Sequence, residues 1–139
     1  MLAKVLSSTL IGIDAILVDV EVDLAAGLPA FATVGLPDGA VKESKDRVRA
    51  ALKNSGYDFP ARRITAHLAP ADIKKEGTAF DLPISIGILA ATGVVKTALL
   101  QQYSLLGELS LDGGLKAIRG ALSMAVAAKR SHSRSAWGA

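Results

Sequence analysis

Apolar and polar residues alternate from residue 13 to residue 24, near the start of the chain. The apolar set is Ile16, Val18, Val20, Val22 and Leu24, and the set between them is Leu17, Asp19, Glu21 and Asp23. Successive side chains of a strand point to opposite faces of a sheet, so this spacing gives one apolar and one mostly acidic face. The segment is therefore predicted to be an antiparallel strand with one face buried and the other in water.

Turn residues and changes of periodicity divide the rest of the chain. The predicted strands are residues 4–11, 13–24, 30–36, 64–69, 104–111 and 115–118, and the predicted helices are residues 39–54, 82–92 and 120–129. Asp38 and Asp81 precede the first two helices, and both are expected to cap them. This order of elements favours an α+β fold, in which helices cover one face of a largely antiparallel or mixed sheet.

Composition limits the chain to one domain and excludes several classes of function. Half of the 139 residues are apolar, enough for one core, which we place in residues 1–130, whereas residues 131–139 carry no periodicity and are expected to form an irregular tail. The chain has no cysteine, which excludes disulfides and thiolate metal sites. Aromatic residues make up only 4%, too few for a surface that stacks nucleic-acid bases. No apolar run is long enough to span a membrane and no secretory signal is visible, so we expect a cytoplasmic protein without a membrane partner.

Motifs for nucleotide binding and for catalysis are missing from the sequence. The glycines at residues 35–39 and 112–114 do not have the spacing of a P-loop or of a dinucleotide-binding loop, and tight turns explain them. His67 and His132 are the only histidines and are far apart in the sequence. No serine, histidine and aspartate grouping and no metal site is therefore predicted.

Basic residues give the clearest signal of binding. Between residues 42 and 75 there are nine lysines and arginines against four acids, a larger excess than the net charge of +3 of the whole chain. On the predicted helix they form a stripe at steps of three and four residues, which consists of Lys42, Lys45, Arg49 and Lys53. An extension of the stripe would comprise Arg62, Arg63, Lys74 and Lys75. Such a stripe binds DNA phosphates, docks on an acidic protein surface, or is simply a solvated helix face, and the sequence leaves these alternatives open.

Several motifs, in one order along the chain, resemble a known family. They are VGLPDGAVKESKDRVRAAL at residues 34–52, NSGY at 54–57, FP at 59–60, RIT at 63–65, LAPAD at 68–72, KEG at 75–77 and FDLPI at 80–84. This set resembles the amino-terminal, ChlI-type domain of the ComM/YifB family of magnesium-chelatase-like AAA+ ATPases, and it covers most of residues 1–130.

The resemblance implies a fold like domain 2 of ribosomal protein S5, which the proteolytic domain of Lon shares. Full-length members carry an AAA+ module that uses ATP and Mg²⁺, assembles as a hexamer and, in the competence protein, drives branch migration of DNA during natural transformation. These residues hold no such module, so no cofactor is expected in this chain. Its implied role is a non-catalytic domain that contacts DNA, the AAA+ module or other subunits, and an open sheet edge could pair with a second copy.

The likeness to Lon also bears on peptidase activity, because Lon-type peptidases use a serine and a lysine. Laying residues 75–79 on the Lon serine motif puts Ala79 at the nucleophile, and laying residues 107–122 on the lysine motif puts Leu122 at the base. Neither side chain can perform the reaction, so no catalytic residue is expected. Two alternatives are a stand-alone nucleic-acid-binding module like the ribosomal protein, and a residual peptidase that uses Thr78, Ser123 or Lys116 instead.

Overall fold

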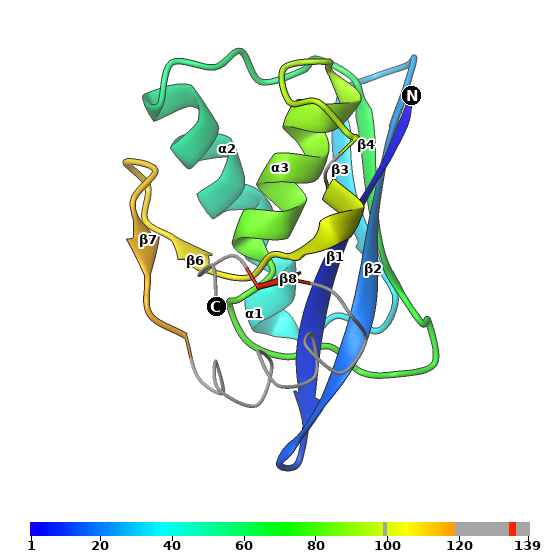
Figure 1. Cartoon of the computed structure of the whole chain (residues 1–139). Helices are drawn as coiled ribbons and strands as arrows, with labels where there is room; N and C mark the ends of the chain where they lie inside the picture. The colour runs from blue at the N-terminus through cyan, green and yellow to red at the C-terminus, as the bar shows by residue number, and fades with distance from the viewer. Residues whose placement is uncertain (99, 119–133, 136–139) are drawn as a thin grey trace.

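The computed structural model describes residues 1–98, 100–118 and 134–135, which form two sheets and a layer of helices (Figure 1). The larger sheet has six strands in the spatial order β3 (Ala30–Val34), β4 (Arg63–Ala69), β2 (Asp14–Ala25), β1 (Leu2–Ile11), β5 (Tyr103–Ser104) and β8 (Arg134–Ser135). The smaller sheet pairs β6 (Glu108–Leu109) with β7 (Leu115–Lys116). The helices are α1 (Gly39–Lys42), α2 (Ser44–Asn54), α3 (Asp81–Ala91) and the 3₁₀ helix η1 (Leu100–Gln102).

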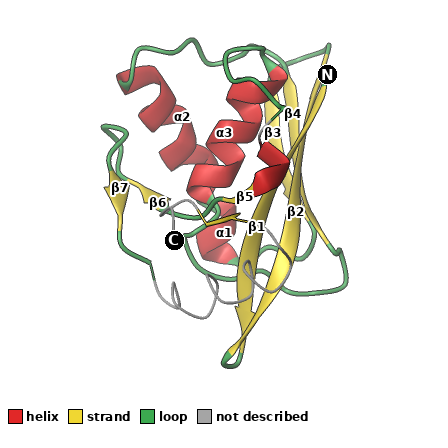
Figure 2. Cartoon of the chain, viewed as in Figure 1, coloured by secondary structure: helices red, strands yellow, loops and turns green. Residues whose placement is uncertain are grey.

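The larger sheet is mixed. β2 is antiparallel to both β1 and β4, whereas β3 is parallel to β4 and β5 is parallel to β1. Parallel neighbours need a crossover, and α1 and α2 form the one that joins β3 to β4. Figure 2 shows α2 and α3 side by side on one side of this sheet. The predicted α+β class is therefore confirmed, with a mixed sheet.

The core lies between this sheet and α3. Val18, Val20 and Val22 are almost fully buried, as the alternation in β2 predicts, while the acids between them face away from the helices. α3 is apolar almost throughout, which fits a helix buried on most sides. At Gly87 a side chain would bring its Cβ to 2.5 Å from Val22 Cγ2, so glycine allows α3 to approach β2 closely.

The predicted helix over residues 39–54 is interrupted at Glu43. Asp38 caps α1 as expected, since its Oδ1 accepts a hydrogen bond of 2.8 Å from the Val41 N–H. Glu43 has φ −69° and ψ −15°, which is close to 3₁₀ geometry, and α2 starts afresh at Ser44.

The predicted strand over residues 104–111 is wrong as a single element. It is divided between β5 and β6, which belong to different sheets. The chain leaves the larger sheet because the Gly107 N–H donates to the Ala79 carbonyl and the Leu82 N–H donates to the Gly107 carbonyl, so this segment is bonded to the start of α3. The hairpin of β6 with β7 is confirmed, whereas the predicted helix 120–129 lies outside the described residues.

The turn after β3 is held in an unusual backbone conformation. Gly35 has φ +106°, and a Cβ there would lie 2.2 Å from the Leu68 carbonyl oxygen, so β3 and β4 can approach only if residue 35 is glycine. Leu36 follows with φ +56°, a left-handed conformation that leucine rarely adopts. Its carbonyl accepts the Lys75 N–H, and the Lys75 carbonyl accepts the Asp38 N–H, so backbone hydrogen bonds hold the turn in place.

We expect Gly35→Ala to destabilise the protein by about 2 to 4 kcal/mol, because the new Cβ combines a backbone clash with an unfavourable φ. Gly39→Ala is the matched control, since nothing lies within 4 Å of a Cβ at that position and alanine favours the helix. Urea unfolding followed by circular dichroism measures both. Equal stability of the two variants would contradict the close approach at Gly35.

Candidate functional site

The predicted basic stripe lies along the exposed side of α1 and α2. Lys42 lies in the last turn of α1, and Lys45, Arg49 and Lys53 follow at steps of four residues along α2. All four side chains are exposed, while the buried residues of α2, such as Val48, face the core. The helices thus separate an apolar side from a cationic one, as the spacing predicts.

An aromatic stack holds one cation of the stripe. The Arg49 guanidinium lies over the Phe59 ring, 5.2 Å from its centroid, and Phe59 stacks on Phe31 of β3 at 6.3 Å between centroids. A cation over an aromatic face is attracted by the ring's electron density. The stack therefore places Arg49 next to the β3 edge of the sheet.

The predicted extension of the stripe is not one continuous surface. Arg62 and Arg63 are exposed at the start of β4. Because Ile64 is buried on the helix side of β4, Arg63 faces the opposite side of the sheet from α2. Lys74 is exposed in the loop before α3 and pairs with Glu76 at 3.5 Å.

The prediction that Lys75 belongs to the basic surface is wrong. Its side chain is fully buried and cannot present its charge to a surface partner. Its ammonium donates to the Pro70 carbonyl, and its backbone bonds with Leu36 and Asp38. Burial lowers the pKa of Lys75, with nearby Asp72 acting in the opposite direction. Its role is structural, since it ties the loop before α3 to the turn after β3.

Asp81 does not cap α3 as expected; it is the centre of a buried polar cluster. The N-cap position is Phe80, and the Asp81 carboxylate, which has no solvent exposure, turns towards α2 instead. It accepts hydrogen bonds from the Ser44 hydroxyl at 2.6 Å and from the Arg47 guanidinium at 2.7 and 3.0 Å. The backbone N–H of Leu109 completes the set at 3.0 Å.

Arg47 is not among the predicted site residues, although its position on α2 indicates that it needs an acidic partner. It lies three residues after Ser44, which faces the core, so its charge falls at the margin of the buried side of α2 and requires an acidic partner. The hydrogen bonds that Arg47 donates to the Asp81 carboxylate raise the pKa of Arg47 above its ordinary value. The Arg47 guanidinium therefore keeps its positive charge in this cluster.

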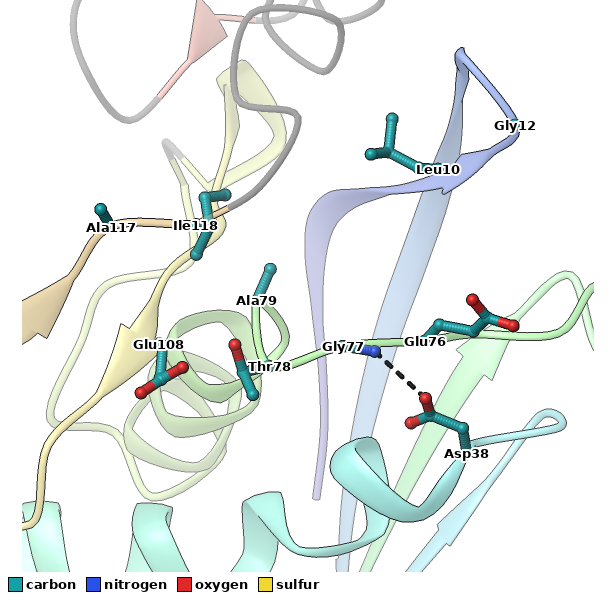
Figure 3. Close-up of a pocket in the computed structure, with 10 residues that line it drawn as sticks. All are labelled: Leu10, Gly12, Asp38, Glu76, Gly77, Thr78, Ala79, Glu108, Ala117 and Ile118. Atoms are coloured by element: carbon teal, nitrogen blue, oxygen red, sulfur yellow. Dashed lines mark hydrogen bonds between the residues drawn. The ribbon is translucent and has the colours of Figure 1, made fainter.

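A pocket of about 640 Å³ opens beside the start of α3 (Figure 3). Ala79 lines it, together with Thr78 and the acids Asp38, Glu76 and Glu108. Figure 3 shows the Gly77 N–H directed at the Asp38 carboxylate, a hydrogen bond of 3.3 Å. Among the described residues that line the pocket there is no serine and no lysine. Leu122 and Ser123 lie outside the described residues.

The described part of the chain contains neither a cluster of metal-binding side chains nor a helix suited to cross a membrane. No three histidine, aspartate or glutamate side chains of residues 1–98 and 100–118 gather closely enough to hold a metal ion. Among the described helices, none has both the length and the apolar character needed to cross a bilayer.

Comparison with known proteins identifies the family. The family model for subunit ChlI of Mg-chelatase matches residues 20–136. The chain belongs to the ChlI family. It is 48% identical over 130 residues to competence protein ComM of Haemophilus influenzae and 47% identical over 130 residues to YifB of Salmonella typhimurium. The resemblance to ComM and YifB proteins is therefore confirmed.

The matched region makes up most of this chain but only a small share of each relative. It includes 94% of this ChlI-family chain but only 26% of ComM and 26% of YifB. The chain thus spans about a quarter of the length of these curated relatives.

In this ChlI-family chain, Arg47→Met is expected to cost about 3 to 5 kcal/mol of stability, because it leaves the Asp81 carboxylate buried without its cation. Lys4→Met is the matched control: Lys4 forms an exposed pair with Asp19 at 3.9 Å, and its loss should change stability by no more than about 0.5 kcal/mol. Thermal and urea unfolding measure both variants. Similar losses in the two variants would show that the buried cluster does not hold the helices together.

The buried ammonium of Lys75 predicts a pH dependence of stability. Because its pKa is lowered in the folded chain, the unfolded chain binds more protons at any pH between the folded value and the ordinary value of about 10.4. The stability of the parent relative to Lys75→Met should therefore rise as the pH rises towards 10.4. Urea unfolding at a series of pH values tests this, with Lys74→Met as a control for the loss of one charge from the same loop. A relative stability that falls over this range would contradict the prediction.

Proposed function

We propose that this chain is a non-catalytic domain of a ComM/YifB-type AAA+ protein, and that it contacts DNA through the basic stripe Lys42, Lys45, Arg49 and Lys53. The family match and the identity to ComM, which is named a competence protein, support a role beside DNA. The observation that carries the DNA contact is the exposure of all four cations along one side of two consecutive helices.

The proposal includes the fold of ribosomal protein S5 domain 2 and of the Lon proteolytic domain, without Lon chemistry. A mixed sheet with helices on one face is compatible with it. Ala79, the residue aligned with the Lon nucleophile, lines the pocket and offers only a methyl group. The sequence has no P-loop motif, so ATP hydrolysis would belong to the rest of a full-length protein.

The geometry of the stripe suits binding to the sugar–phosphate backbone. Lys45 and Lys53 are eight residues apart, which corresponds to about 12 Å along a helix. Duplex DNA carries about one negative charge per 1.7 Å of its axis, so several phosphates lie within the reach of these side chains. The stripe itself consists of cations and has no aromatic side chain to stack on DNA bases. Its contacts with DNA should therefore be independent of base sequence and sensitive to salt.

Neutralising the stripe should weaken duplex binding and its salt dependence together. For Lys45→Gln/Arg49→Gln/Lys53→Gln we expect the slope of log K against log salt to become shallower by up to about 2.7, since each phosphate contact contributes about 0.9. Fluorescence anisotropy with a labelled DNA duplex at several salt concentrations measures the slope.

The matched control is Lys4→Gln/Lys96→Gln/Lys116→Gln, which removes the same charge from exposed positions outside the stripe. It should keep most of the parent's slope. Equal slopes in the two triple variants would show that net charge alone attracts DNA and would refute the stripe as the contact. No DNA binding by the parent would favour the rival use of the stripe, which is docking on an acidic protein surface.

A further inference from the structure

β3 is the outermost strand of the larger sheet and has one free edge within the described residues. The Ala30 N–H donates to the Arg62 carbonyl, so it points towards β4. Backbone groups alternate in direction along a strand, and therefore those of Phe31 and Thr33 point the other way. Neither residue has a backbone hydrogen bond on that side among the described residues. The edge thus offers two N–H and two C=O groups to an added strand.

The strand itself carries few of the features that usually prevent pairing with another strand, although it is short and Pro29 precedes it. Natural edge strands are commonly protected by charged residues, prolines or bulges. The strand Ala30–Val34 contains no charge and no proline. Two large apolar residues flank it in exposed positions, Leu28 with 83% and Leu36 with 54% of its surface accessible. The surface is therefore suited to main-chain pairing with apolar contacts at both ends.

Leu36, at the carboxyl-terminal end of this edge, has a strained backbone conformation. Its φ of +56° is unfavourable for leucine, and its side chain gains little burial in return. The close approach of Gly35 to Leu68 and the hydrogen bond from the Lys75 N–H fix this conformation. Strain that the surrounding structure maintains while a leucine stays exposed is characteristic of a residue that contacts a partner.

Two arginine side chains lie near β3 and favour one kind of added strand. Arg49 is linked to Phe31 through the stack on Phe59. The Arg63 side chain lies beside the segment that leads into β3, since a Cβ at Gly27 would lie 2.8 Å from Arg63 Cδ. A second copy of this chain would bring like charges together at the paired edges, which is destabilising. An acidic strand would bring opposite charges together.

We infer that the free edge of β3 binds an extended, acidic segment of a partner polypeptide by strand addition. Main-chain hydrogen bonds to Phe31 and Thr33 supply the pairing, Leu28 and Leu36 supply apolar contacts, and the arginines select carboxylates. This contact shares Arg49 with the stripe, but it differs from the phosphate contact because it also depends on backbone groups of β3.

The probe is a synthetic peptide of alternating valine and glutamate, eight residues long, labelled at its amino end and titrated against the intact chain. Thr33→Pro removes one outward N–H and is expected to weaken binding by about tenfold. Thr33→Val, the matched control, keeps that N–H and should bind like the parent. The corresponding valine–lysine peptide should not bind at the same concentrations.

A second measurement covers the case in which Thr33→Pro fails to fold. A peptide that carries N-methyl groups on alternate residues, in both registers, cannot donate to the edge and should lose binding to the parent by a similar factor. Equal binding of plain and methylated peptides, or of Thr33→Pro and Thr33→Val, would overturn the inference.

The same experiment distinguishes the other occupants. Concentration-dependent dimers that Thr33→Pro abolishes, without peptide binding, would identify a second copy as the partner and overturn the inference. Loss of duplex binding in Thr33→Pro but not in Thr33→Val would assign the edge to nucleic acid, with the same consequence. If the variant Lys45→Gln/Lys53→Gln still binds the peptide, the result supports the inference. This holds whether or not the stripe proves to bind DNA.

Discussion

The buried carboxylate of Asp81 is the interaction on which the arrangement of the helices depends. Removing a carboxylate from water is costly, and here four hydrogen bonds from two segments offset that cost. Those bonds come from two residues of α2 and from the backbone of β6, so one group fixes α2, α3 and the small sheet relative to one another. The outward direction of the basic stripe follows, because Ser44 and Arg47 orient α2 with its lysines towards water.

The turn after β3 connects the two candidate surfaces. Gly35 and Leu36 end the edge strand, and Asp38 starts α1, the helix that carries the first lysine of the stripe. Lys75 bonds to this turn from the opposite side, through its backbone. A short segment thus determines both where the free edge ends and where the cationic helices begin. Changes in this segment would affect both surfaces, because Leu36 flanks the free edge and Asp38 caps the helix that carries Lys42.

Much of the fold could be predicted from the sequence, because each of its strongest patterns lies within one strand or one helix. The alternation in β2 and the apolar length of α3 report burial directly. The roles of Asp81 and Lys75 could not be predicted in this way, since an aspartate before a helix usually caps it and a lysine in a polar loop usually faces water. Their partners, Arg47 and Pro70, are set by tertiary contacts that no local pattern encodes.

The pairing of β1 with β5 has a consequence for how the chain reaches this structure. Leu6 lies beside Ser104 in the sheet, so one side of β1 pairs only with a strand that follows almost 100 residues later in the chain. Contacts that join such distant positions form late and slow the search for the native topology. During translation, β1 and β2 can already form their hairpin, while the other side of β1 stays bare. Until β5 pairs with it, that side of β1 is an open strand edge, the kind of edge that favours pairing with other chains.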